Sequence, residues 1–107
     1  MLTVQLFFGQ TLPGGGRVTD RQWLGFLRDS VTPAFPDGFT ALDAYGQWLD
    51  PAAHRLVRER SKVIELALAD TDAARAAVDQ VIEAYKRRFR QQVVGEISSA
   101  ACGNFRP

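Results

Sequence analysis

The chain has 107 residues and a formal net charge of +1, with 46% hydrophobic and 23% charged residues. These values predict one globular domain over residues 1–107. The near-neutral charge argues against nucleic acid as a partner, and no apolar segment is long enough to span a membrane. Because Cys102 and His54 are the only residues of their kinds, we expect neither an internal disulfide nor a metal site built from such ligands. No cofactor motif is present, so no cofactor is expected.

Alternating apolar residues at the start of the chain predict a first β-strand over residues 2–8, which Gly9 ends. The PGGGR segment at 13–17 follows it. A phosphate-binding loop requires a Lys-Ser/Thr pair and a helix directly after its glycines, and both are missing here. We therefore interpret this segment as a hairpin-like connector.

A first helix is predicted to begin after Thr19, because Gln22 three residues later completes a capping box. Trp23 and Phe26 fall at helical spacing and should face the core. Pro33 is expected to end the helix, since a proline disfavours helical geometry in the residue before it.

The TPAFPDGF segment at 32–39 has two interpretations. It can be a rigid connector whose phenylalanines close the edge of the core. It can also be a binding loop, because recognition residues are often found on loops held by a rigid scaffold.

Two further strands are predicted over 39–49 and 56–68, with Gly46 as a candidate bulge position. Thr71 is predicted to cap a second helix, and a last strand is expected over 93–100. The apolar stripe of the second helix consists of Ala74, Val78, Val81, Tyr85 and Phe89.

The predicted order is βαββαβ, which is typical of the ferredoxin-like α+β fold with a four-stranded antiparallel sheet and two helices on one face. The other face, which we call the open face, keeps apolar side chains such as Phe7 and either Tyr45 or Trp48. Half-apolar exposed faces commonly meet a partner. We therefore expect a homodimer formed through the sheet, as in dimeric α/β barrels.

Six segments carry a resemblance to a known family. They are LFFG (6–9), VTDRQWLGFL (18–27), TPAFPDGFTALDAYGQW (32–48), RERSK (58–62), AYKRRF (84–89) and CGNF (102–105). In this order they resemble the bacterial family called domain of unknown function 3574.

The resemblance implies a small α+β domain and no particular reaction. Members are often exported, so it suggests a periplasmic or cell-envelope protein if a leader has been removed, and a cytoplasmic protein otherwise. In the family pattern an arginine commonly stands where Ala34 stands here, so an anion-binding role of that arginine would not transfer.

The register of the two central strands decides which charged residues meet. If Leu49 lies opposite Leu56, then Asp43 lies opposite Lys62. A slip of one residue would instead place Asp43 on the face that carries Glu59. The first register is favoured because it pairs opposite charges across the strands.

In this register Tyr45 lies opposite Arg60, which predicts a small pocket on the open face. Arg60 or Lys62 would bind an anionic group beside an aromatic wall, and Asp43 is the candidate catalytic acid or base. The structural alternative is a set of cross-strand ion pairs on a sheet that dimerises. The predicted ligand-binding residues are Tyr45, Gln47, Trp48, Arg60 and Lys62.

Two functions follow from these features. The favoured one is a non-catalytic domain that binds a partner or a small anionic or aromatic ligand and acts as a homodimer. The alternative is a cofactor-free enzyme, similar to small monooxygenases or isomerases, with its site on the open face. The alternative depends on fold analogy, which is weak because one fold supports many functions.

Overall fold

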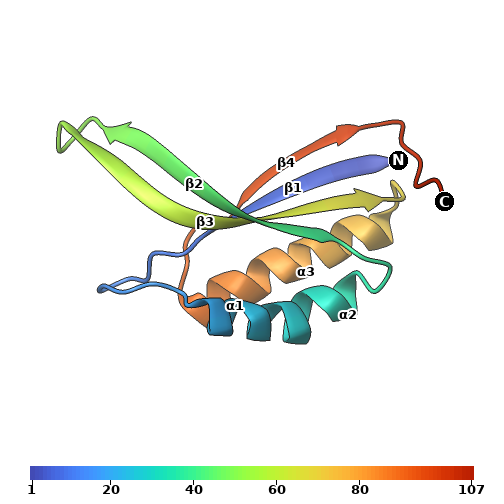
Figure 1. Ribbon diagram of the computed structural model, residues 1–107, viewed down its shortest axis with the longest axis horizontal. Helices are drawn as coiled ribbons and strands as arrows, with labels where there is room; N and C mark the ends of the chain where they lie inside the picture. The colour runs from blue at the N-terminus through green and yellow to red at the C-terminus, as the bar shows by residue number, and fades with distance from the viewer.

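A four-stranded antiparallel sheet forms one layer of the molecule, and the helices form a second layer on one of its faces (Figure 1). This computed structural model describes residues 1–107. The strand order is β2-β3-β1-β4. The strands are β1 (Leu2–Gly9), β2 (Thr40–Asp50), β3 (Arg55–Leu68) and β4 (Gly95–Ala100). The α+β class is therefore confirmed.

The helical layer has two parts. The first is continuous and consists of α1 (Asp20–Phe26), the π-helical turn η1 (Leu27–Val31) and α2 (Thr32–Ala34). The second is the long helix α3 (Asp72–Phe89). No helix is both long and apolar enough to cross a membrane.

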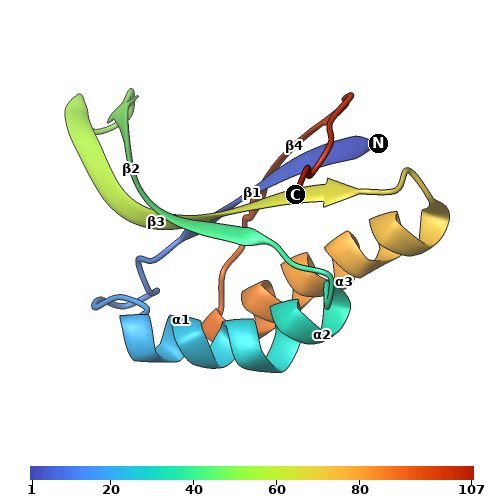
Figure 2. The same cartoon turned by 45° about the vertical axis from the view of Figure 1, so that its right-hand side comes forward.

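The β2–β3 hairpin extends past the helical layer and bends away from it (Figure 2). Its tip is consequently exposed on both faces, and the side chains of Tyr45, Trp48 and Leu49 are at least half exposed. The hairpin therefore carries apolar groups that the core of a single chain does not cover.

The connector between β1 and α1 is the predicted hairpin. Thr11 bridges to Arg17, and the three glycines between them all have positive φ angles, which glycine adopts without steric cost. The predicted capping box is also confirmed. Thr19 Oγ1 accepts a hydrogen bond from the Gln22 amide at 3.1 Å, and the Gln22 side chain accepts one from the Thr19 amide at 2.9 Å.

The prediction that Pro33 ends the helix is wrong. Thr32 keeps helical angles (φ −58°, ψ −44°), and its amide bonds to the Leu27 carbonyl five residues back. The wide π-helical turn directly precedes the proline, which lies near the start of α2. The helix ends one turn later than expected, before Phe35.

Two other details of the sheet differ from prediction. Every residue of β2 from Thr40 to Asp50 has one partner on β3, so Gly46 forms no bulge and the alternation of faces is unbroken. The last strand begins at Gly95 instead of Val93. Gly95 lies against Phe7, and an added Cβ would be 3.2 Å from the Phe7 Cβ.

The core lies between the helices and β1. The side chains of β1 alternate, and Phe8 on the helix-facing side is fully buried. Its ring contacts those of Trp23 at 5.3 Å, Phe26 at 5.8 Å and Tyr85 at 4.8 Å between centroids. Tilted and edge-to-face aromatic pairs of this kind add to the stabilisation from burial.

Tyr85 connects this core to the end of β1. Its hydroxyl donates a hydrogen bond to the Gly9 carbonyl at 2.6 Å. Burial raises the pKa of the phenol well above its ordinary value, and the charge of Glu59 adds to the shift. The group is therefore a neutral donor at physiological pH.

Tyr85→Phe should lower the free energy of unfolding by about 1 kcal/mol, because it removes this hydrogen bond and keeps the ring. Urea denaturation followed by circular dichroism measures the change. Tyr45→Phe is the matched control, since Tyr45 is 62% exposed and the change should leave stability unaltered. Equal losses in the two variants would contradict the role assigned to Tyr85.

Candidate functional site

Lys62 is the centre of the candidate site. Although it is a lysine, it is only 7% exposed. Its ammonium donates hydrogen bonds to Asp43 Oδ1 at 2.5 Å and to Asp20 Oδ1 at 3.0 Å. The predicted strand register is confirmed, because Asp43 lies opposite Lys62 and Tyr45 lies opposite Arg60.

A short backbone network places α1 beside β3. The Gln10 amide donates to the Arg60 carbonyl at 3.1 Å, and the Val18 amide donates to the Gln10 carbonyl at 2.7 Å. The buried Gln10 side chain also donates to the Val18 carbonyl at 3.0 Å. Arg17 and Asp20, on either side of this anchored segment, are thereby held next to β3.

A cavity of about 250 Å³ opens at this junction. Three cations and two carboxylates line it, so its charge is positive by one. Neither Arg17 nor Arg60 takes part in a salt bridge. The charged and aromatic residues that line it are Arg17, Asp20, Asp43, Tyr45, Arg60 and Lys62.

The ionisable groups stabilise one another. The hydrogen bond and charge of Lys62 hold the pKa of Asp20 below its ordinary value of 3.8, and the charges of Arg17 and Arg60 add to this effect. Burial acts to lower the pKa of Lys62, but its hydrogen bonds to Asp43 and Asp20 outweigh it, so the pKa is raised. Both groups are therefore charged at neutral pH.

The predicted position of this cluster on the open face is wrong. Phe8, which faces the helices, lies opposite Lys62, and Lys62 lies opposite Asp43. Cross-strand neighbours share a face, so this row is on the helix-facing side. The strand alternation places Tyr45 and Arg60 on that side too.

Two predicted ligand-binding residues lie outside the cavity. Gln47 shares the helix-facing side but lies opposite Arg58, nearer the hairpin tip. Trp48 points to the open face, where it is 50% exposed and lines a separate hollow with Phe7 and Glu59. Trp48 therefore cannot form one wall with Tyr45.

The structure adds Arg17 and Asp20, which the sequence analysis did not select. In the sequence, Arg17 is one residue of a glycine-rich connector and Asp20 is an ordinary acid in the first turn of a helix. The available signal was the capping box, which fixes where α1 begins. The closeness of α1 to β3 is a long-range contact with no sequence motif.

The cavity offers two free guanidinium groups and an exposed phenol ring around an ion-paired lysine. Such groups can bind an anion and stack on a planar ring. No group of three or more His, Cys, Asp and Glu side chains is placed to hold a metal ion.

Together these features define an α+β domain with one helix-covered sheet face and a charged cavity at its edge. The chain belongs to the family described as "Protein of unknown function (DUF3574)", which matches residues 3–105. This confirms the family resemblance. A search of the curated proteins finds no match.

Solved structures with a similar fold include a phage SAM lyase in complex with S-methyl-5'-thioadenosine. The TM-score is 0.66 at 14% sequence identity, over 92% of this chain and 79% of that one. The apo state of the lyase has a TM-score of 0.65 at 14% sequence identity, over 92% of this chain and 78% of that one. B. subtilis GlnK in complex with ATP has a TM-score of 0.51 at 12% sequence identity, over 92% of this chain and 84% of that one. At such low sequence identities, these comparisons show a similarity of fold alone.

Asp20→Asn should lower the free energy of unfolding at neutral pH, because the ion pair with Lys62 is lost. A carboxyl group whose pKa is lowered by folding stabilises the protein above its unfolded pKa and loses this effect as the pH falls through its folded pKa. The difference between the variant and the unaltered protein should therefore shrink as the pH falls below 3.8 and vanish only below the lower pKa that Asp20 has in the folded protein.

Urea denaturation at a series of pH values measures this difference. Asp79→Asn is the control, since Asp79 forms no salt bridge and its substitution should give no such pH-dependent difference. An Asp20→Asn difference that persists unchanged in acid would contradict the ion-pair assignment.

Proposed function

We propose that this chain is a non-catalytic ligand-binding domain that acts as a homodimer and binds a small anion carrying a planar ring. The observation that carries the proposal is the cavity beside α1. There, Arg17 and Arg60 have no salt-bridge partner, and both line the same space as the exposed ring of Tyr45.

The chemistry of the cavity supports an anionic ligand. A guanidinium group presents paired donors that match the oxygens of a phosphate or carboxylate. Lys62 is already neutralised by two carboxylates, so we assign it a scaffolding role. The volume of about 250 Å³ is slightly below the range of about 300–1,000 Å³ for sites that enclose drug-sized ligands. A small ligand that remains partly exposed fits it best.

The similar solved structures support the choice of a test ligand. The phage SAM lyase is described with S-methyl-5'-thioadenosine and GlnK with ATP. Both molecules join an adenine ring to a ribose, and ATP adds phosphate. A nucleoside monophosphate combines the planar ring and the single anionic group for which this cavity is suited.

The homodimer and the ferredoxin-like fold type are parts of the same proposal. The βαββαβ order and the strand order β2-β3-β1-β4 support the fold type. Exposed apolar side chains on both edge strands of the open face support a sheet-to-sheet dimer, because association would remove them from water. Leu42 is 43%, Trp48 50% and Ile97 61% exposed, and all three lie on that face.

A cofactor-free enzyme that uses Asp43 as acid or base remains the alternative function, and the cavity supports it less well. Asp43 Oδ1 already accepts a hydrogen bond from the Lys62 ammonium. A general base needs an oxygen free to take a proton from the substrate. Only Oδ2 of Asp43 is left for that role.

AMP should bind more tightly than adenosine or inorganic phosphate, because only AMP offers both the ring and the anion. Arg60→Gln should weaken AMP binding about tenfold, consistent with the loss of one charge-assisted hydrogen bond. Isothermal titration calorimetry measures the affinities, and circular dichroism checks the fold.

Arg58→Gln is the matched control for this experiment. Arg58 lies on the same strand and face as Arg60, carries the same charge and does not line the cavity. Its substitution should leave AMP affinity unchanged. Equal losses in both variants, or equal affinity for AMP and adenosine, would overturn the proposed binding site.

Sedimentation velocity should show a dimer for the unaltered protein and a monomer for Leu42→Arg, because a buried unpaired charge would oppose association at the open face. Leu24→Arg is the control. Leu24 is 62% exposed on α1, away from the sheet, so this variant should stay dimeric. A monomeric unaltered protein would refute the assembly.

A further inference from the structure

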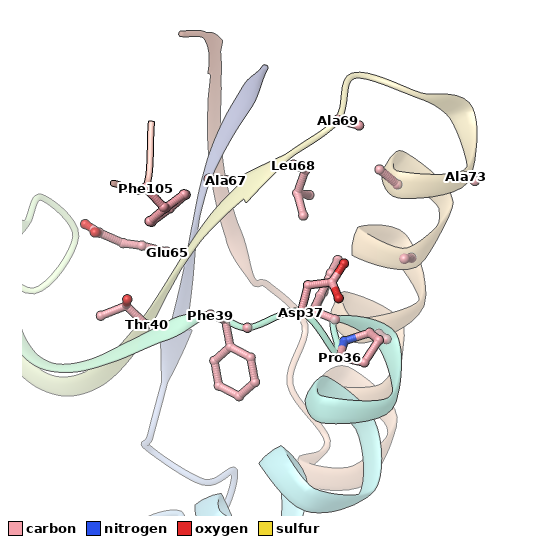
Figure 3. A pocket seen from close by; sticks show the side chains of 15 residues that line it. Pro36, Asp37, Phe39, Thr40, Glu65, Ala67, Leu68, Ala69, Ala73 and Phe105 are labelled. Atoms are coloured by element: carbon pink, nitrogen blue, oxygen red, sulfur yellow. The ribbon is translucent and has the colours of Figure 1, made fainter. Parts of the chain in front are cut away.

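A second cavity, of about 750 Å³, lies at the opposite end of the first helical segment. It is bounded by the loop after α2, the end of β3 and the first turns of α3 (Figure 3). It shares no lining residue with the cavity around Lys62. Its volume falls within the range of about 300–1,000 Å³ typical of small-molecule sites.

Two features of the chain create this space. The first two turns of α3 present alanines, Ala73, Ala74 and Ala77, where larger side chains would fill the gap. The strand β2 begins only at Thr40, opposite Glu65, so the last three residues of β3 have no partner strand on that side. The wall is therefore apolar and lacks a neighbouring strand.

The charge of this cavity is negative. Asp37 and Glu65 are the only charged residues that line it, and neither forms a salt bridge. The Glu65 carboxylate accepts one hydrogen bond, from the Gln5 amide group at 3.1 Å. Both carboxylates therefore keep free oxygens that a cation can reach.

Aromatic side chains accompany the two carboxylates. Figure 3 shows Asp37 on the loop beside Pro36, on the α3 side of β3, and Glu65 and Phe105 across β3 from it. The Phe39 ring also lines the cavity and points away from Glu65 and Phe105. The faces of aromatic rings attract ammonium groups, in addition to providing apolar contact.

We propose that this cavity binds a small organic cation, an ammonium group attached to an apolar body. The ammonium is held by Asp37, and the apolar body packs against the alanines of α3. Glu65 is the cross-strand partner of Gln5 and lies on the open face, where it adds negative charge at the rim of the cavity. Charge complementarity selects this class, because the lining has two carboxylates and no lysine, arginine or histidine. The inference is independent of the proposed anion site, which has different residues and the opposite charge.

The probe is 2-phenylethylammonium, with 2-phenylethanol and phenylacetate as neutral and anionic counterparts of similar shape. In a ¹⁵N-labelled NMR titration the ammonium should shift amide signals of the loop around Gly38 and of the start of α3. The alcohol should bind at least fivefold more weakly and phenylacetate should cause no shifts there. Signals around Arg60 should stay unchanged, which separates this result from that of the AMP experiment.

Substitutions test the charge and the space separately. Asp37→Asn should weaken binding of 2-phenylethylammonium about fivefold, the size expected for one exposed ion pair, whereas Asp79→Asn on α3 should not. Ala73→Phe should weaken binding at least fivefold, because its ring would occupy the wall of α3 against which the apolar body packs. Ala76→Phe, also at an exposed position on α3 but outside the lining, should preserve it.

The proposal is overturned if 2-phenylethanol binds as tightly as the ammonium, if no shifts occur at the loop and α3, or if each variant and its control behave alike. Circular dichroism of the variants establishes that any loss of binding occurs in a folded protein.

Discussion

The contact of Phe8 with the aromatic side chains of the helices determines the face on which the candidate site residues lie. Phe8 is fully buried, with its ring 4.8 Å from that of Tyr85 between centroids. It lies opposite Lys62, which in turn lies opposite Asp43. Because side chains alternate along a strand, shifting β1 by one residue would turn Phe8 outward and break this row. The core thereby positions the ion pairs of the cavity.

The sequence predicts part of this arrangement well. The pairing of Asp43 with Lys62 follows from the hairpin alone, since opposite charges and the facing leucines select one register. The face of the sheet on which this pair lies does not follow from the sequence. The strand β2 has exposed side chains on both sides, so its alternation does not indicate which side is buried. Its face is set through β3 by the pairing with Phe8 on β1, a long-range contact that no local pattern specifies.

The first helical segment is also predictable only in part. Its beginning is predictable because the capping box of Thr19 and Gln22 is a local signal. Its end is not, because the π-helical turn Leu27–Val31 accommodates Pro33 through a hydrogen bond to a residue five positions back. The extra turn extends the segment to Ala34, so one end of it contributes Asp20 to one cavity and the other end contributes Ala34 to the second.

This extension keeps the two cavities apart. At about 1.5 Å per residue, Asp20 and Ala34 are separated by about 20 Å along the segment. Charges farther apart than about 10 Å are largely screened at about 0.1 M salt. Each cavity therefore presents its own charge to a ligand, positive around Arg60 and negative around Asp37. The formal net charge of +1 argues against binding to a polyanion, yet it is compatible with two local sites of opposite sign because the charges on the chain are unevenly distributed.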